Sequence, residues 1–367
     1  MRAIVLVGGE GTRLRPLTYS TPKPLLPIAN EPFLERQLTW LAAHGIDEVV
    51  LSLGYLPDAF AARFPDDRFG DLVLRYAVED EPLGTAGGIR YAAEVAGIDE
   101  RFVVCNGDVL TTLDLTEMVR FHDAHGGEAT IHLCRVDDPS AFGVVPTLTS
   151  GEVMAFVEKP PRGKAPSDWI NAGTYVLEPS VLDRIPPRLM VSIERETFPR
   201  MLDHAGRLFA RQSDAYWIDI GTPEKYLEAH ADVLSGRLGA PPARGAVEMS
   251  PGVWTQGAVS IAADARVEPP VLLGPGASVG AGARVGRSVL GPGCVVGSGA
   301  CVLRSVLLDG AELASDTEAV DAVVGPEAVL EPGVIATDRT IIGASAVVAA
   351  GSKLAGARVP VQVPTSQ

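Results

Sequence analysis

The first apolar run of the chain, AIVLV, leads into a loop rich in glycine and positive charge. The loop carries Gly8, Gly9 and Gly11, then Arg13, and continues into Lys23, which stands between two prolines. Because glycine has no side chain, backbone N–H groups in such a loop can come close to an anion. The prolines restrict the backbone around the lysine, so less entropy is lost when its ammonium group is ordered on an anion. These residues predict a phosphate site, with a tight turn and solvated cations as the alternative.

Two common phosphate-binding loops do not fit this stretch. A P-loop would need a second glycine five residues after Gly8, followed by Lys-Ser or Lys-Thr, and that position is Arg13. A dinucleotide-binding fingerprint starting at Gly9 and Gly11 would need glycine or alanine at the position of Leu14. The loop therefore belongs to a different class of phosphate site.

Two aspartates follow apolar runs in positions where they could bind a metal ion. Asp108 follows FVVCNG, and Asp219 follows YWI and precedes a helix opening at Thr222-Pro223. Mg²⁺ prefers oxygen ligands and completes its shell with phosphate oxygens and water, so two carboxylates suffice. A single aspartate after a strand is more often a cap or a turn residue, which is the alternative for each of them taken alone.

The elements that must position these residues alternate along the chain up to about residue 235. Short apolar runs separated by helix patterns are typical of a sheet of parallel strands with helices on both faces. One helix pattern begins at Pro32 and ends at Gly45. Ligands of open α/β sheets bind beyond the carboxyl ends of the strands, so we expect the chemistry there. The expected strands are 3–7, 48–53, 72–78 and 102–108.

Residues 236–367 follow a different pattern, with one aromatic residue, Trp254, and no histidine. Aliphatic residues recur every six positions among small residues and Gly-Pro pairs. This period predicts a parallel β-helix, in which each short strand is one wall of a coil and stacked coils bury the core. A flexible Gly/Ala-rich tail would keep no fixed aliphatic frame. The expected inward residues are Ile261, Val267, Leu273, Val279, Val285, Leu290, Val296, Val302, Leu308, Val329, Ile335, Ile341 and Val347.

The two patterns divide a chain of 367 residues, long enough for two domains. We expect an α/β domain over 1–235, a linker over 236–250 and a β-helix over 251–360. The Gly- and Pro-rich composition of the middle stretch favours a linker there.

The motif Gly8-Gly9-x-Gly11-Thr12-Arg13-Leu14, followed by Pro22-Lys23-Pro24-Leu25, resembles the signature of the sugar-1-phosphate nucleotidyltransferases. The stretches SIERETFP (192–199) and WIDIGTPEKYLEAH (217–230) strengthen the likeness to the mannose-1-phosphate guanylyltransferases within that family. The resemblance runs through most of 1–235 and implies a Rossmann-like mixed sheet. The C-terminal half resembles hexapeptide-repeat domains, whose β-helix is left-handed.

The resemblance implies roles for the loop and for both aspartates. Arg13 would stabilise charge on the α-phosphate of a nucleoside triphosphate and on the leaving pyrophosphate, as a fixed cation can do, and Lys23 would contact the phosphates. Asp108 and Asp219 would bind Mg²⁺. The remaining nucleotide-binding positions implied are Leu6, Gly8, Gly9, Gly11, Thr12, Glu79, Gly84 and Thr85.

Glu79 indicates which nucleotide base the protein binds. Relatives that use uridine or thymidine triphosphate tend to carry glutamine five residues before the glycine at position 84, whereas this chain carries glutamate. An ionised carboxylate only accepts hydrogen bonds, which suits the N1–H and amino group of guanine, so GTP is favoured. A solvated acidic turn is the alternative.

The residues predicted to bind the sugar phosphate, here called the sugar side, lie in the stretches AFGVV, FVEKP and INAGTYVLEP. By resemblance Lys159 would hold the sugar phosphate, and Glu158, Asn171 and backbone near Gly173 would bind hydroxyl groups, with Gly143 in the same wall. Ordinary turn chemistry is the alternative for each residue. Mannose 1-phosphate is favoured, while glucose and heptose phosphates stay open.

Three other functions are alternatives to a guanylyltransferase. A glucose-1-phosphate uridylyl- or thymidylyltransferase would differ only in substrates, and a non-catalytic nucleotide-sugar-binding regulatory subunit would be expected to lose Arg13 or an aspartate. An acyltransferase in the β-helix would generally need a histidine base, and the last histidine is His230, before the hexads begin. The β-helix is therefore expected to serve assembly or regulation, and a homo-oligomer is expected.

The composition narrows the partners further. A formal net charge of −15 argues against nucleic acid and membrane surfaces as partners. The four cysteines show no metal spacing, which favours a reduced, cytoplasmic protein. The N-terminal apolar run is too short for a signal peptide or a membrane span.

Overall fold

The computed structural model of the chain describes residues 1–203 and 207–360, and its contacts divide it into two compact units. The first unit comprises Met1–Gly9 and Leu34–Trp217, and the second comprises Glu10–Phe33 and Ile218–Gln367. The glycine loop is thus shared, since Gly8 and Gly9 lie in the first unit and Arg13 and Lys23 in the second. Whether segments 1–235 and 251–360 fold as separate domains stays a prediction.

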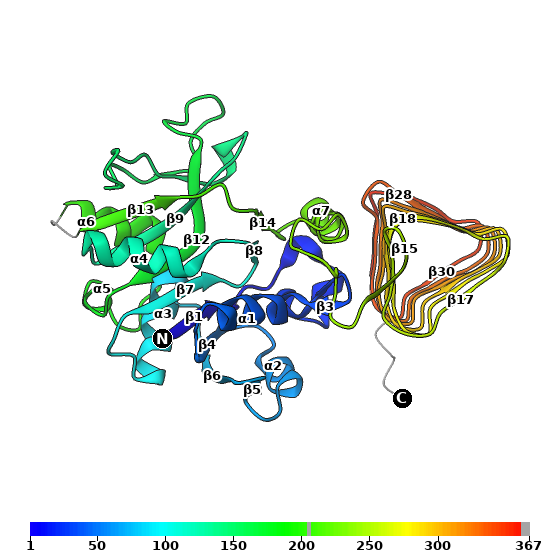
Figure 1. The fold of residues 1–367 in the computed structure, drawn as a ribbon, viewed down its shortest axis with the longest axis horizontal. Coiled ribbons are helices and arrows are strands. Elements are labelled where there is room, and N and C mark those ends of the chain that lie inside the picture. Colours follow the sequence, from blue (N-terminus) through cyan, green and yellow to red (C-terminus); the bar gives the residue numbers. More distant parts are fainter. Residues whose placement is uncertain (204–206, 361–367) are drawn as a thin grey trace. The chain divides into compact units, whose positions relative to one another are not determined.

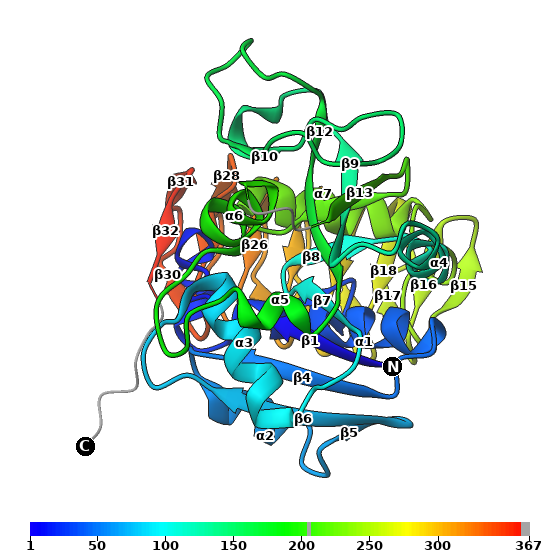
Figure 2. The ribbon, with the colours of Figure 1, turned by 90° about the vertical axis from the view of Figure 1, so that its left-hand side faces the viewer.

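A mixed sheet forms the centre of the first unit (Figure 1). Four of its strands are parallel, and these are seen side by side in Figure 2. Because the carboxyl ends of parallel strands share one edge, the residues that follow these four strands gather there. The strands in spatial order are β11 (Val157–Glu158), β10 (Gly143–Val144), β12 (Trp169–Leu177), β7 (Phe102–Asn106), β1 (Arg2–Leu6), β4 (Glu48–Leu53), β6 (Leu72–Val78) and β5 (Arg68–Phe69), of which β7, β1, β4 and β6 are the parallel set.

The rest of this sheet is largely antiparallel and begins at β12, which runs opposite to β7. β12 also pairs with β9 (Ala129–Arg135), and β13 (Leu208–Gln212) extends the sheet beyond β9. The ladder between β12 and β9 is interrupted between Asn171 and Tyr175. The strands predicted over 48–53 and 72–78 are confirmed, and the one predicted over 102–108 ends at Asn106.

Helices cover the sheet because its aliphatic residues alternate between two buried faces. Ile4, Val50 and Val104 pack with α3, whereas Val5 and Leu51 point to the other face, and all five are fully buried. The predicted helix is α1, which starts one residue after Pro32 and ends at Ala43. The helices of this unit are α1 (Phe33–Ala43), α2 (Pro57–Arg63), α3 (Gly84–Ala96), α4 (Leu115–His125), α5 (Ser180–Asp183), α6 (Phe198–Asp203), the 3₁₀ turn η4 (Pro139–Ala141) and the π-helical turn η5 (Ile193–Thr197).

His132 on β9 is fully buried, and neither of its ring nitrogens has a hydrogen-bond partner among the described residues. Burial lowers the pKa of His132 to about 3, and the neighbouring cation Arg211 acts in the same direction. The unfolded chain takes up this proton near pH 6.5, so the folded state loses stability as the pH falls from 6.5 toward 3.

We therefore expect His132→Leu to reduce the acid sensitivity of the protein. Between pH 7 and pH 5 the free energy of unfolding should fall by about 2 kcal/mol less in the variant than in the parent protein. Urea unfolding at the two pH values measures this difference. An equal fall in both proteins would mean that His132 is protonated in the folded state.

The second unit begins with the loop that carries Arg13 and Lys23. Short 3₁₀ turns and one hairpin build this loop, and they are η1 (Thr12–Leu14), η2 (Leu17–Tyr19), η3 (Lys23–Leu25), β2 (Pro27–Ile28) and β3 (Glu31–Pro32). Strand β8 (Val109–Thr111) belongs to the first unit. Strand β14 (Trp217–Asp219) begins in the first unit and ends in the second, and α7 (Pro223–Leu234) follows it. Thr222 caps α7, since its hydroxyl oxygen accepts a hydrogen bond from Lys225 N at 3.3 Å.

Residues 247–359 form a left-handed parallel β-helix, whose coils appear as a triangle in Figure 1. Successive coils pair in register, so that Val285 lies opposite Val302, 17 positions later. β15 (Val247–Ser250) caps the first coil by running antiparallel to β16. The strands that follow it are β16 (Val253–Thr255), β17 (Ser260–Ile261), β18 (Arg266–Leu273), β19 (Ser278–Val279), β20 (Arg284–Leu290), β21 (Val295–Val296), β22 (Cys301–Leu303), β23 (Val306–Leu307), β24 (Glu312–Leu313), β25 (Glu318–Val320), β26 (Val323–Val324), β27 (Val329–Leu330), β28 (Ile335–Thr337), β29 (Ile341–Ile342), β30 (Val347–Val348), β31 (Lys353–Ala355) and β32 (Arg358–Val359).

The six-residue frame is correct up to Val302 and wrong by one position after it, since Leu307 belongs to the core in place of the predicted Leu308 and the last run is displaced by one residue as well. Val279, Val285, Leu290, Val296 and Val302 belong to the buried core of the β-helix. In the last run, however, the core consists of the next residue each time, and Val347 is 47% exposed. The sequence offers two adjacent aliphatic residues there, so apolar character alone does not identify the inward one. The corrected inward residues are Leu330, Ala336, Ile342 and Val348, in place of Val329, Ile335, Ile341 and Val347.

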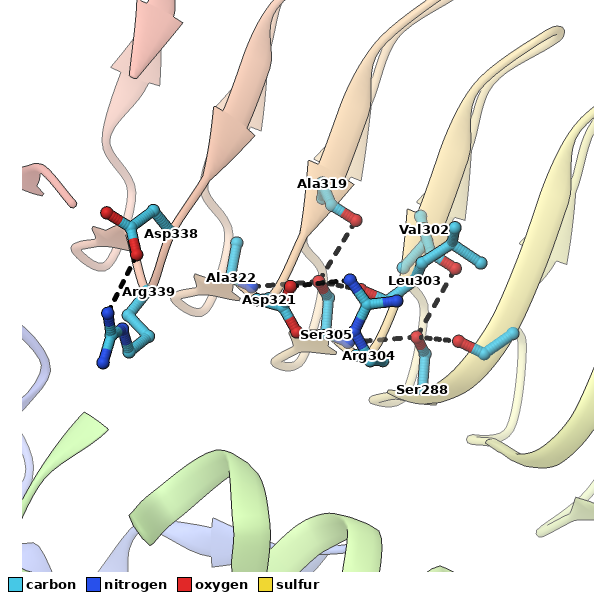
Figure 3. A network of polar contacts seen from close by, with 11 residues as sticks. Ser288, Val302, Leu303, Arg304, Ser305, Ala319, Asp321, Ala322, Asp338 and Arg339 are labelled. Carbon is cyan, nitrogen blue, oxygen red and sulfur yellow. Dashed lines mark hydrogen bonds and ion pairs between the residues drawn. The ribbon is translucent and has the colours of Figure 1, made fainter. Parts of the chain in front are cut away.

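Serine hydroxyls pair with backbone groups at one corner of the stacked coils (Figure 3). Ser288 Oγ donates to the Gly286 carbonyl at 2.8 Å and accepts from Ser305 N at 3.1 Å. Ser305 Oγ in turn donates to the Leu303 carbonyl at 2.9 Å and accepts from Ala322 N at 3.0 Å. Each hydroxyl satisfies a buried backbone group that would otherwise cost free energy, so this corner is polar yet stable.

Two expectations from the sequence concern the oxidation state of the cysteines and the presence of membrane spans. All four cysteines are free thiols, and burial raises the pKa of Cys105 and of Cys294 to about 12. Among the described residues, no helix combines the length and the apolar character needed to cross a bilayer.

Candidate active site

The carboxyl end of β1 meets a neighbouring loop at close range. Val7 N donates to the Ser52 carbonyl at 3.0 Å, and a Cβ on Gly54 would lie 3.1 Å from the carbonyl oxygen of Gly8. Gly9 has open space around it and is exposed. The first unit therefore presents bare backbone at Gly8 and Gly9, next to the end of Leu6, as a phosphate site requires.

Glu79 closes the turn that precedes α3. Its Oε1 accepts from Ser52 Oγ at 2.9 Å, and its Oε2 accepts from Leu83 N at 2.9 Å. A Cβ on Gly88 would lie 2.7 Å from Glu79 Oε1, so α3 can pass the carboxylate only with glycine there. Each carboxylate oxygen still has a further lone pair, so Glu79 can hold the turn and also accept from a base.

The start of α3 packs on the chain segment that leads into η5. Gly84 has φ +69, and a Cβ on it would lie 2.7 Å from the Val191 carbonyl oxygen. Thr85 Oγ1 accepts from Ile193 N at 2.8 Å and lies 2.8 Å from Glu194 Oε2, to which it donates. Gly84 and Thr85 thus have a packing role, whether or not they also contact a nucleotide.

Asp108 follows β7 through a glycine that tolerates no side chain. A Cβ on Gly107 would lie 2.4 Å from Val7 Cγ1 and 2.5 Å from the Leu6 carbonyl oxygen. Gly107 N donates to that carbonyl at 2.8 Å, so the chain turns tightly against the end of β1. Asp108 is half-buried at this edge of the sheet, beside the backbone predicted to meet phosphate.

An open cavity of about 320 Å³ lies in the first unit. It gathers four of the five residues predicted for the sugar side, while Gly173 lies on β12 two positions after Asn171. The residues that line it are Ala141, Phe142, Gly143, Glu158, Lys159, Asn171, Ser192, Glu194 and Arg195. Gly143 is required because a Cβ there would lie 2.7 Å from Phe156 and 3.1 Å from Glu158 Oε2.

The cavity combines two cations with two carboxylates. Glu158 Oε1 lies 3.4 Å from Lys159 Nζ and 3.5 Å from Arg195 Nη2. Both cations are largely exposed, with 58% and 62% of their side chains accessible, so both are free to turn toward an anion. Exposed ion pairs of this kind contribute little to the stability of the fold, so both cations can leave Glu158 for a ligand at little cost in free energy.

A hydrogen-bond network joins the cavity to the start of α3. Asn171 Nδ2 donates to Tyr175 Oη at 2.8 Å, and Asn171 Oδ1 accepts from Gly173 N at 3.0 Å. Glu194 accepts from Ser192 Oγ at 2.8 Å and from Thr85. Burial raises the pKa of Tyr175, and the Glu194 carboxylate acts in the same direction. The phenol is therefore neutral.

Sequence reasoning missed the contribution of η5 to this cavity. Ser192, Glu194 and Arg195 lie in the stretch SIERETFP, which supports the family resemblance but contains none of the predicted site residues. The signal that could have identified them is one hydroxyl, one carboxylate and one guanidinium within four residues, a set suited to sugar hydroxyls and phosphate.

The second unit places the predicted cations against the glycine loop. Gly11 has φ +62, and a Cβ on it would lie 3.0 Å from Lys23 Cβ. Thr18 Oγ1 donates to the Gly11 carbonyl at 3.0 Å and fixes the turn. Lys23 is only 7% exposed, because its stem lies on this loop. A turn with two solvated cations is therefore wrong for Lys23.

Arg13 lies over the segment that precedes α7. A Cβ on Gly221 would lie 2.7 Å from Arg13 Nη2, so glycine allows the guanidinium to pass there. Asp219 is two residues earlier, and its Oδ1 accepts from Gly221 N at 3.5 Å. The second unit thus brings Gly11, Arg13, Lys23 and Asp219 into one neighbourhood, with Thr12 in the same turn.

Within residues 1–203 and 207–360, no group of three or more His, Cys, Asp or Glu side chains has an arrangement that could hold a metal ion. A metal would therefore take at most two ligands of these types at one place, and the rest of its shell from substrate oxygens and water. Asp108 and Asp219 supply oxygen ligands, which fit a hard cation.

Comparisons with known proteins agree on both halves of the chain. Residues 2–236 match the family described as nucleotidyl transferase, and residues 267–364 match the family described as GMPPB C-terminal domain. The chain is 44% identical over 287 residues to the mannose-1-phosphate guanylyltransferase of Mycobacterium tuberculosis, covering 77% of this chain and 76% of that protein. It is 46% identical over 234 residues to the probable mannose-1-phosphate guanylyltransferase 2 of Arabidopsis thaliana, covering 62% of this chain and 63% of that protein.

The solved structure of HddC from Yersinia pseudotuberculosis is similar to part of the chain, with a TM-score of 0.54 and 31% identity over 62% of this chain and 97% of HddC. The same protein has been solved in complex with GMP-PN, with the same TM-score of 0.54. Both similarities cover most of HddC and less than two thirds of this chain.

Proposed function

Because the chain belongs to the nucleotidyl transferase family, we propose that it transfers the guanylyl group of GTP to mannose 1-phosphate, giving GDP-mannose and pyrophosphate. The observation that carries this proposal is the cavity lined by Lys159, Arg195, Glu158 and Glu194. Two exposed cations suit a sugar phosphate, and two carboxylates suit the sugar hydroxyls beside it. The relatives named above have the same activity in their names.

The reaction needs no covalent intermediate with the enzyme. An oxygen of the sugar phosphate attacks the α-phosphorus of GTP, the bond from that phosphorus to the bridging oxygen breaks, and pyrophosphate leaves with the electron pair. Negative charge gathers on the α-phosphate and on the leaving group. Arg13 and Lys23 would stabilise that charge, and the backbone at Gly8, Gly9 and Gly11 would donate to phosphate oxygens.

A divalent metal ion is part of this proposal, with Mg²⁺ as the ion and Asp108 and Asp219 as its protein ligands. Enzymes of this family typically use a divalent metal. When bound, the ion would neutralise phosphate charge in the transition state. Asp108 follows β7 after Gly107, which packs against the end of β1, and Asp219 is the last residue of β14, two positions before Gly221.

Glu79 is proposed to select guanine. Its carboxylate accepts from Ser52 and Leu83, and the lone pairs left over can accept from the N1–H and amino group of guanine. Uracil presents acceptors at the corresponding edge, so a carboxylate would repel it. Leu6, Thr12, Gly84 and Thr85 complete the proposed nucleotide site.

On the sugar side, Lys159 and Arg195 are proposed to bind the phosphate of mannose 1-phosphate. Glu158, Asn171 and Glu194 would accept from or donate to its hydroxyls, with Gly143 and Gly173 allowing close approach. We also propose a cytoplasmic location, in keeping with four free thiols, and a homo-oligomeric assembly.

A pyrophosphate-release assay with purified protein and Mg²⁺ tests this function. GTP, UTP, dTTP, CTP and ATP are each combined with mannose, glucose and heptose 1-phosphates, and turnover is expected to be highest with GTP and mannose 1-phosphate. Turnover with UTP but not GTP would remove the role of Glu79. Absence of turnover with every pair would contradict the enzyme and favour a regulatory nucleotide-sugar-binding protein.

A further inference from the structure

A short hairpin follows Lys23 in the second unit. β2 and β3 pair antiparallel, and the two residues between them, Ala29 and Asn30, both have positive φ, +47 and +62. Two consecutive left-handed residues form the tight turn that joins antiparallel strands. Alanine is strained in this conformation, whereas asparagine tolerates it. Ala29 is nevertheless fully buried, so contacts outside the hairpin must stabilise the turn.

The hairpin is tied to Lys23 through the backbone. Leu26 N donates to the Lys23 carbonyl at 3.1 Å, and the Leu26 carbonyl accepts from Phe33 N at 3.0 Å. Leu26 therefore links the lysine turn at one end to the base of the hairpin at the other. A displacement of the hairpin is passed to Lys23 over these two bonds, because only three residues separate Lys23 from β2.

Helix α7 fixes one side of the hairpin. Tyr226 Oη donates to the Pro27 carbonyl at 2.6 Å, and Ala29 N donates to His230 Nδ1 at 3.2 Å. Tyr226 is fully buried and His230 is 2% exposed. Burial raises the pKa of Tyr226, so its phenol keeps the proton that it donates.

The first coils of the β-helix fix the tip. Asn30 Nδ2 donates to Gln256 Oε1 at 3.1 Å and to the Leu290 carbonyl at 3.0 Å. Gln256 Nε2 donates to the Arg244 carbonyl at 3.1 Å, and Arg244 Nε donates to Glu31 Oε1 at 3.2 Å. These contacts close a ring from Asn30 through the chain before the β-helix and back to the hairpin.

We propose that Asn30 is a positioning residue for Lys23, and that the first coils of the β-helix act through it to keep the lysine in its phosphate-binding geometry. Asn30 uses both amide hydrogens on acceptors outside the hairpin, so it is the residue that joins the two parts. The proposal rests on the proposed function, because it assumes that Lys23 meets substrate phosphate. It gives the β-helix a role in the chemistry besides assembly.

Asn30→Gly tests the proposal, because glycine keeps the left-handed turn and removes the two anchoring bonds. We expect kcat to fall by about 10- to 100-fold, as for a small misplacement of a charged group, while KM for the sugar phosphate stays unchanged. Gln256→Ala, a change within the first coil of the β-helix, should act in the same direction more weakly. Asp321→Gly is the matched control, because Asp321 also has a positive φ (+51) and also joins two coils. Its Oδ1 accepts from Arg304 Nε at 2.7 Å, and neither residue belongs to the hairpin, so kcat should stay unchanged.

A double-mutant cycle separates positioning from general loss of structure. If Asn30 acts through Lys23, adding Asn30→Gly to Lys23→Ala lowers kcat no further. Multiplied losses in the double variant, or an unchanged kcat in Asn30→Gly, would overturn the proposal.

Amide hydrogen exchange gives a readout that does not depend on activity. In Asn30→Gly the amides of Leu26 and Phe33 should exchange faster, while those of the β-helix core stay protected. Unchanged exchange at Leu26 would overturn the proposal even in a protein that turns over no substrate. Failure of the proposed function and failure of this inference are therefore distinguishable.

Discussion

Arg13→Ala is expected to lower kcat by about 1000-fold, because a fixed cation that meets developing phosphate charge is worth several kcal/mol in the transition state. Arg13 is exposed and lies over Gly221, so its removal leaves no cavity in a core and no buried charge unpaired. The melting temperature should therefore stay within a few degrees of the parent protein. Steady-state kinetics with GTP and mannose 1-phosphate, together with calorimetry, measure both quantities.

Arg15→Ala is the matched control in the same loop. Arg15 pairs with Glu10 at 2.6 Å and lies over the ring of Tyr19 at 5.1 Å, so its charge is already used within the loop. This variant should keep kcat within a factor of about three, as surface substitutions do. Equal losses in the two variants would show that the loop needs positive charge in general and would remove the specific role of Arg13.

Asp108→Asn is expected to abolish measurable turnover, with a loss of at least about 1000-fold, because the amide would remove the negative charge that we propose as a ligand of the metal ion. The change keeps the shape of the side chain on a tight glycine connection, so folding should be nearly unaffected. Raising the Mg²⁺ concentration should restore part of the activity if the loss comes from metal affinity.

Asp114→Asn provides the control for an aspartate with a purely structural role. Asp114 caps α4 by accepting from Glu117 N at 2.9 Å, and asparagine caps a helix about as well. Activity and stability should both stay close to those of the parent protein. Full activity in Asp108→Asn, with Mg²⁺ still required, would exclude Asp108 from the metal site.

Much of the fold could be predicted from the local pattern of apolar and polar residues in the sequence. Strand Glu48–Leu53 carries aliphatic residues on both of its faces because both faces of the sheet are covered, and such a run is easily recognised in a sequence. Glu158, Lys159 and Asn171, which we propose for the sugar side, line one cavity because they follow or occupy paired strands. The six-residue period predicted the β-helix, whereas the mixed sheet was implied by the family resemblance, since the local pattern alone predicted parallel strands.

What could not be predicted depends on contacts between residues far apart in the chain. Nothing near Asn30 in the sequence shows that its amide reaches Leu290, and nothing near Lys23 shows that its stem is buried against Gly11. The contribution of Glu194 to the cavity depends on a π-helical turn that propensity does not predict. In the last coils, adjacent aliphatic residues left the inward position undetermined, and only the stacking resolves it.

The in-register stacking of the coils also sets how the length of this protein can change during evolution. Each coil pairs only with its two neighbours, as Val302 does with Val285 and Ala319, each 17 positions away. A deletion of one whole coil rejoins two equivalent edges and leaves the first coils, which hold Asn30, untouched. A difference of one residue in coil length is accommodated, since Val323 pairs with Ile341, 18 positions later, whereas Val285 pairs with Val302, 17 positions later. The C-terminal half can therefore gain or lose whole coils at its far end without disturbing the contacts of Asn30, so related chains that differ in the number of coils should keep the hairpin contacts.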